Sequence, residues 1–305
     1  MSTRALATYG VGAGVWCLLG ASDVRADQWE APETREYASP TGKHRLKVIP
    51  NQDWWKPPAK RKAERRCKGI LYKIRDGDRK EVWSRQLIND LIPVRAYVTD
   101  SGRYVVTMDE WHGVGKLPVV IYGPSGNLIK THDIDSLGLG DDIEHIDRTV
   151  SSYWWNQDAI IFFGPKEEKL FVRLHWGKTL IIDLQSGGVH TADKPDSRGG
   201  SRTALLGYAK KKTRGIALSL LDSNDAHERS TGALICGQLK IRQAIPRLKE
   251  LLSDSRYHVE HSGFGPYRNV YYVRKRAAEA LQGMGVEVRE VILEKKQWRY
   301  DPPRR

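Results

Sequence analysis

Cysteine is scarce in this sequence, with three among 305 residues. Cys17 lies in an N-terminal segment that we expect to be removed, which leaves Cys67 and Cys236, far apart and in stretches of different character. Because Cys236 lies in a helical apolar stripe, where a buried free thiol is ordinary, we do not expect a disulfide between them. No CxxC pair or His/Cys cluster has the spacing of a zinc site, so the sequence predicts no metal.

Short catalytic motifs are also missing. The sequence has no Gly-x-Ser-x-Gly, Walker-type loop, GxGxxG after a strand or His-Glu-x-x-His, and it indicates no cofactor. Asp109, Glu110 and His112 follow a predicted strand, where a carboxylate and an imidazole could share a cleft; alternatively, Trp111 packs while its neighbours stay solvated. Paired acids do not identify a glycosidase without the separation of the carboxylates. A hydrolase acting on an anionic polymer, with these three as acid and base residues, is the alternative function.

The N-terminus has the order of a secretory signal. A small basic region, residues 1–4, precedes a mostly apolar stretch, residues 5–21, and then Val24-Arg25-Ala26. This order predicts a signal peptide over residues 1–26. An uncleaved anchor is disfavoured, because four glycines dilute a run already short of the roughly 20 residues that span a bilayer. We therefore expect an exported, bacterial-type protein that is extracytoplasmic, either periplasmic or secreted.

Negative charge is in deficit. The chain has 50 Lys and Arg residues against 37 Asp and Glu, a net charge of +13, which removal of residues 1–26 lowers by one to +12. This balance favours anionic partners. In an exported protein we expect a protein or an anionic cell-envelope component, including peripheral contact with membrane headgroups, rather than nucleic acid. The sequence indicates no oligomeric state.

The β-rich half is clearest between residues 93 and 134, where β-branched runs alternate with Gly, Asp, Ser and Pro turns. We expect a meander of four antiparallel strands there. His44–Ile49 is expected to be a strand, and Asp76-Gly77 a hairpin turn between Gly69–Arg75 and Lys80–Ser84. A third group of short strands follows Ser151. The strand units expected in this third group are Ala159–Phe163, Leu170–Leu174 and Thr179–Leu184.

The strand groups recur about once every 50 residues. The stretches "VTDSGRYVVTMDEW" and "VVIYGPSGNLIKTHDI" resemble the blades of WD-like and other repeat propellers, in which a strand, an Asp-Ser-Gly turn and a second strand precede another Gly-rich turn. The resemblance covers residues 36–189. About three such units fall short of the usual minimum of four in a ring. A partial propeller, a sandwich of stacked sheets and a ring completed by another chain all remain open.

A basic segment interrupts the β half at residues 51–68. From Lys56 to Lys68, seven lysines and arginines face one acid, Glu64, and two tryptophans precede them. The segment is either a solvated loop or a patch for an anionic surface, with the tryptophans packing or inserting beside the charges. The candidate binding residues here are Trp54, Trp55, Lys60, Arg61, Arg65 and Arg66.

After residue 192 the apolar period changes from two to about 3.6, typical of helices. The stretches "LLDSNDAHERSTGALICG" and "LLSDSRYH…VRKRAAEALQGMG" resemble successive HEAT-type repeats. In each, an apolar helix ends in Asp and a second helix carries an Arg followed by small residues. The small residues would let paired helices approach closely, and the Asp and Arg could join adjacent turns. A fifth helix is expected to begin at Val288. Two repeats bury little alone, so we expect them to lean on the β half or on a partner.

Two further stretches are candidate sites. An insertion in the second repeat, residues 258–272, is an aromatic recognition loop, a loop that packs on the β half, or a metal site through His258, Glu260 and His261. The acids and histidine of residues 138–148 are either calcium ligands or a solvated connection that pairs with basic segments. The candidate binding residues of the insertion are Phe264, Tyr267, Tyr271 and Tyr272.

The sequence thus predicts an α+β multidomain chain: an antiparallel β-meander, as partial propeller or sandwich, followed by a short HEAT-like helical repeat domain. The leading function is a non-catalytic exported interaction or scaffold protein. The expected units are a signal peptide (1–26), a β-rich domain (36–192), a linker (193–212), helical repeats (213–295) and a basic tail (296–305).

Export is the first testable prediction. The mature protein should begin at or near Asp27, because the basic, apolar and Val-x-Ala segments lie in the order that signal peptidase reads. Mass spectrometry of protein purified from its native envelope fraction measures this directly. An intact Met1 on protein recovered from the cytoplasm would contradict it.

Overall fold

The computed structural model describes residues 30–192, 201–260, 266–289 and 291–297. The predicted signal peptide, Phe264 and His261 lie outside these ranges. Within them, no helix has the length and apolarity needed to cross a membrane.

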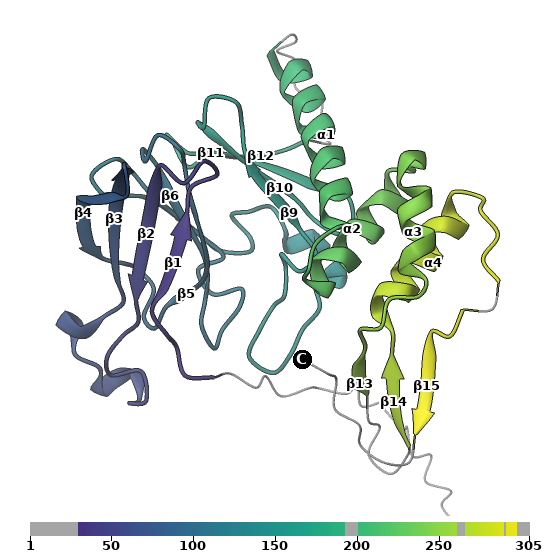
Figure 1. Cartoon of the computed structure of the whole chain (residues 1–305). Helices are drawn as coiled ribbons and strands as arrows, with labels where there is room; N and C mark the ends of the chain where they lie inside the picture. The colour runs from purple at the N-terminus through teal and green to yellow at the C-terminus, as the bar shows by residue number, and fades with distance from the viewer. Residues whose placement is uncertain (1–29, 193–200, 261–265, 290, 298–305) are drawn as a thin grey trace, which may run out of the picture.

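Three four-stranded antiparallel sheets follow one another along the chain, and each keeps its strands in sequence order (Figure 1). The first holds β1 (Arg35–Ala38), β2 (His44–Ile49), β3 (Lys68–Arg75) and β4 (Asp78–Gln86). The second holds β5 (Pro93–Val98), β6 (Val105–Glu110), β7 (Val119–Tyr122) and β8 (Leu128–His132). The third holds β9 (Ile160–Phe163), β10 (Lys169–Arg173), β11 (Thr179–Asp183) and β12 (Val189–Thr191).

The expected strands are confirmed, with ends shifted by at most two residues. The predicted hairpin turn has positive φ at Asp76 (53°) and Gly77 (89°), the backbone that a two-residue hairpin needs. Three consecutive four-stranded meanders have the strand arrangement of propeller blades.

Burial patterns show how the sheets stack. In β2, buried and half-buried residues alternate, as in a sheet with one covered face, whereas all six residues of β6 are buried. Val105 in β6 packs with Leu46 and Leu71 of the first sheet, while Val106 packs with Val172 of the third. The second sheet is therefore sandwiched between its neighbours, and each fully buried aliphatic side chain contributes about 1.5–3 kcal/mol.

Helices cover the remaining face of the third sheet. α1 (Ser201–Leu220) and α2 (Ala226–Gln238) lie beside it in Figure 1, followed by α3 (Ile245–Leu251) and α4 (Tyr272–Gly283). Phe162 and Phe171 stack with ring centroids 5.2 Å apart and share a core with these helices. The short 3₁₀ segments are Pro58–Lys60, Ala63–Arg65, Gly140–His145 and Arg242–Ala244.

Small residues set the helix spacing. A Cβ on Gly232 would lie 2.9 Å from the carbonyl oxygen of Ala217, and one on Gly237 would lie 2.8 Å from Cα of Ala280. α2 therefore approaches both α1 and α4 more closely than a larger side chain would permit. Such close approach is what the small residues of the HEAT-like pattern predicted for Gly232.

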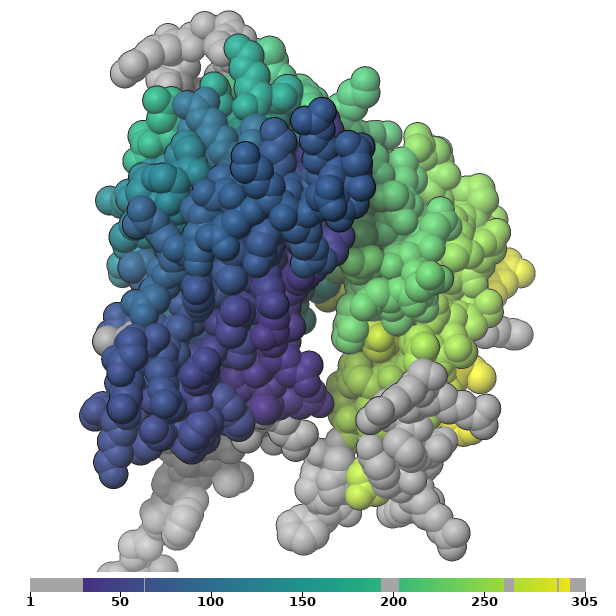
Figure 2. Space-filling model, turned by 60° about the vertical axis from the view of Figure 1, so that its left-hand side comes forward, coloured from purple at the N-terminus to yellow at the C-terminus, as the bar shows by residue number. Residues whose placement is uncertain are grey.

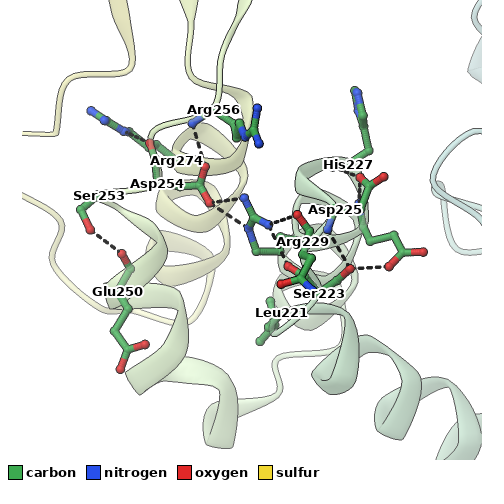
Figure 3. Close-up of polar contacts among 12 residues, drawn as sticks. Leu221, Ser223, Asp225, His227, Arg229, Glu250, Ser253, Asp254, Arg256 and Arg274 are labelled. Atoms are coloured by element: carbon green, nitrogen blue, oxygen red, sulfur yellow. Dashed lines mark hydrogen bonds and ion pairs between the residues drawn. The ribbon is translucent and has the colours of Figure 1, made fainter. Parts of the chain in front are cut away.

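An Asp–Arg contact joins the two repeat-like stretches (Figure 3). Arg229 on α2 donates from Nε and Nη2 to Oδ2 of Asp254, which follows α3, at 2.8 Å each. Arg229 also donates to the carbonyl of Ser223, and Arg274 donates to the carbonyl of Asp254. The side chains of Arg229 and Asp254 are only 12% and 7% exposed, so water screens the pair little.

Two expectations for the helical half, after residue 192, are wrong. α1 begins at Ser201, so residues 201–212 are helical rather than linker. No helix follows α4 in the described residues; residues 294–297 form β15 (Glu294–Gln297), which joins β13 (His258–Glu260) and β14 (Tyr267–Val270) in a small sheet. Gly285, at φ 77°, ends α4, and Val286 and Val288 then alternate with charged residues at the strand period of two.

Substitution of Arg229 by alanine should lower the free energy of unfolding by about 2–4 kcal/mol, because the buried carboxylate of Asp254 loses its charged partner. Arg276→Ala is the matched control, since its ion pair with Glu279 is well exposed and should contribute less than about 1 kcal/mol. Urea unfolding followed by circular dichroism compares the two. Equal losses for both variants would contradict a structural role for the Arg229–Asp254 pair.

Candidate functional site

The basic segment, residues 51–68, is built around Asp53. This carboxylate is fully buried and contacts Nζ of Lys56 at 2.9 Å and Nη1 of Arg65 at 3.1 Å, and its pKa is lowered, first by the hydrogen bond from Lys56. Arg61 pairs with Asp90, from the connection between the first two sheets, and donates to the carbonyls of Lys56 and Trp54. Acids of the chain itself therefore neutralise three of the seven cations.

The remaining cations face solvent. Lys60, Lys62 and Arg66 are exposed, and Trp55 beside them is 63% exposed. Trp54 instead packs against the core of the first two sheets, with its ring 6.2 Å from that of Trp55 in an edge-to-face contact. The predicted binding residues thus divide in two: Trp55, Lys60 and Arg66 are presented outward, whereas Trp54, Arg61 and Arg65 hold the segment in place.

The predicted aromatic recognition loop is largely a packed sheet edge. Tyr272 stacks between His227 of α2 and His258 of β13, with centroid separations of 5.0 and 5.6 Å. The guanidinium of Arg274 lies 4.0 Å from the ring centroid of Tyr271. Tyr267 is half-buried in β14 and pairs with β15. These tyrosines contact the rest of the helical half instead of projecting as a loop.

Neither metal interpretation is supported by the described residues, which contain no group of three or more ligating side chains. His258 Nε2 contacts Glu260 at 2.9 Å, and Glu260 also accepts from Arg268. In the acidic connection, Asp142 forms an ion pair with Lys178 and His145 stacks on Trp176. The basic partner of that connection is thus a lysine in the turn between β10 and β11. Cys67 and Cys236 are both buried and unpaired, as expected.

The predicted acid–base group does not share a cleft. Asp109 lines a cleft, is 1% exposed and has a φ of 62°. Its carboxylate accepts from the Gly115 amide (2.9 Å), Trp155 Nε1 (2.8 Å) and Asn156 Nδ2 (2.7 Å). Glu110 accepts instead from the backbone amides of residues 90–92, at 2.8–3.3 Å, while His112 is exposed.

The two acids therefore serve different junctions. Successive side chains of a strand point to opposite faces, which sends the neighbours Asp109 and Glu110 in different directions. Asp109 binds the connection that leads to the third sheet, and Glu110 binds the connection that arrives from the first. Burial raises the pKa of Asp109 to about 6 and also raises that of Glu110. Sequence reasoning grouped these residues by proximity along the chain, without regard to strand alternation.

Comparison with known proteins leaves the family open. No protein-family model and no curated protein sequence matches the chain. Solved structures with some similarity include the C-terminal WD40 domain of Sif2, at 7% identity and a TM-score of 0.27, covering 53% of this chain and 40% of that one. HIRA(644-1017) is another, at 11% identity and a TM-score of 0.30, and the match covers 85% of this chain and 95% of that one. The description of the fold therefore depends on the sheets themselves.

The raised pKa of Asp109 gives a pH prediction. The pKa of Asp109 is about 6 in the folded state and about 3.8 in the unfolded state, so the folded state keeps the proton to a higher pH. The contribution of this group to the free energy of unfolding is therefore complete below the unfolded pKa and is lost as the pH rises through 6. The stability of the natural protein relative to Asp109→Asn should fall by about 2 kcal/mol between pH 4 and pH 7.

Urea unfolding of both proteins across that range measures the difference, and the titrations of all other groups cancel between them. Parallel pH profiles would show that Asp109 titrates alike in both states.

Proposed function

We propose that this chain is a non-catalytic, exported interaction protein whose basic segment binds an anionic component of the cell envelope. The single observation that carries the proposal is the exposure of Trp55 beside Lys60, Lys62 and Arg66. A large aromatic surrounded by unpaired cations is the composition of an interfacial anchor, because the indole inserts among headgroups while the charges remain in water.

The anchoring of the segment supports the same proposal. Asp53 and Asp90 fix its backbone through Lys56, Arg61 and Arg65, so the outward side chains are presented on a defined scaffold. Ordering the loop in advance lowers the entropy lost on binding. Each exposed cation near an anionic surface contributes on the order of 1 kcal/mol at low salt, so Lys60, Lys62 and Arg66 together give a weak, salt-sensitive attachment.

The rest of the chain fits a scaffold. We assign the β half to a propeller-like stack of three blades and the helices to a short HEAT-like array, supported by the Arg229–Asp254 contact and by the close packing at Gly232. Export is supported by residues 1–26 of the sequence. A hydrolase is the weaker proposal, because Glu110 and His112 do not converge on Asp109.

Reversal of the exposed charges is the test. Lys60→Glu/Lys62→Glu/Arg66→Glu should weaken binding to phosphatidylglycerol-containing vesicles by at least about tenfold at low salt, and Trp55→Ala should weaken it less, while the unfolding midpoint stays unchanged. Vesicle co-sedimentation at low and high salt measures this. Acidic polysaccharide beads form a second arm that distinguishes lipid from polymer.

The control is Lys210→Glu/Lys211→Glu/Lys212→Glu, an equal charge change at exposed positions of α1. If the control weakens binding as much as the test variant, attraction is a property of net charge and not of the basic segment. Binding that persists in high salt would likewise contradict the proposal.

A further inference from the structure

A cleft of about 730 Å³ separates the β half from the helices. Its walls come from β5, from residues 154–161 leading into β9, and from facing ends of α1 and α2. In Figure 2 a furrow runs between the purple and blue sheets and the green helices. A cavity of this size suits a small ligand or a few side chains of a peptide.

Three carboxylates line this cleft from three different parts of the chain. They belong to Asp109 in β6, Asp158 before β9 and Glu228 in the first turn of α2. Asp158 has a φ of 55° and accepts a hydrogen bond of 2.5 Å from the hydroxyl of Thr231 on α2. This bond ties the two walls together and fixes the position of the Asp158 carboxylate.

Ion pairs among the described residues do not neutralise these carboxylates, although the charge of Arg95 acts on Asp109. In the described part of the chain, none of the three forms an ion pair, although the sequence has 50 lysines and arginines. Arg95 is the one lysine or arginine among the described lining residues. The cleft is therefore an acidic depression in a strongly basic molecule, and low-dielectric walls focus its field on a cation.

The remaining walls suit the stem of a long cationic side chain. Ile161, Ile216 and Leu220 provide aliphatic surface, and Tyr97 and Trp154 provide aromatic surface. Arginine and lysine bury their methylene stems against such surface while the charged end reaches a polar group. A guanidinium also stacks on aromatic faces.

We propose that this cleft binds an arginine or lysine side chain carried on an extended basic peptide, with the charged group between Asp158 and Glu228. The backbone of the peptide lies along the furrow between the sheets and the helices, which is open at its ends. This site is separate from the basic segment, which would repel such a peptide, so the two interactions can be tested independently.

The test uses the full mature chain and a fluorescent peptide, Ac-Ala-Arg-Ala-Arg-Ala-NH₂, titrated by anisotropy at low salt. The same peptide with citrulline in place of arginine keeps the shape and removes the charge. Asp158→Asn and Glu228→Gln keep an oxygen acceptor for Thr231 and Ser223, so the fold should be retained. Glu81→Gln, an exposed acid of β4, is the matched charge control.

The arginine peptide should bind, and each cleft variant should weaken binding roughly five- to tenfold with an unchanged unfolding midpoint, while Glu81→Gln leaves it unaltered. The citrulline peptide should not bind. Equal effects of the cleft and control variants, binding of the citrulline peptide, or absence of binding at about 1 mM peptide would overturn the proposal. Spermidine that binds as tightly as the peptide would overturn the assignment to a polypeptide.

Discussion

The structure depends on covering sheets that are apolar on both faces. Val105 and Val106 of β6, or Phe162 and Phe163 of β9, are neighbours that enter different cores, so neither sheet can leave one side to water. A propeller meets this constraint by closing a ring of blades. The described part of this chain has three four-stranded sheets and meets the constraint at one end with helices, which occupy the face of the third sheet that a following blade would cover.

The elements that could be predicted from the sequence are those that depend on residues close together along the chain. Strands and turns of the β half depend on neighbours a few residues away, and their period of two and the Asp76-Gly77 turn were sufficient. β14 and β15 are separated by residues 271–293, which are 23 residues of intervening chain, and no local pattern in residues 286–297 indicated the partner. The beginning of α1 was misplaced because Gly207 and the run Lys210-Lys211-Lys212 interrupt the apolar pattern, although Leu205, Leu206 and Ala209 pack in the core.

The same reasoning explains the outcome for the candidate sites. The composition of the basic segment was visible in the sequence, but its ion pairs were not. Arg61 pairs with Asp90, 29 residues later, and the Asp53 carboxylate is buried within the segment. Counting charges therefore overestimated those that are free. The acidic cleft was missed for the opposite reason, since Asp109, Asp158 and Glu228 are too far apart in sequence to form a motif.

The end of β6 has a consequence for cooperativity. Asp109 and Glu110 occupy consecutive positions. The Asp109 carboxylate accepts from Trp155 and Asn156 on the third-sheet side, besides the Gly115 amide of its own sheet, whereas the Glu110 carboxylate accepts from amides of residues 89–92 on the first-sheet side. If the first or the third sheet separates from the second, the carboxylate of Glu110 or of Asp109 loses hydrogen-bond donors. Because the two residues are joined by one peptide bond, a backbone displacement at one junction also displaces the carboxylate at the other. The three sheets should consequently behave as one mechanical unit, without the independent fraying expected of a linear stack of repeats.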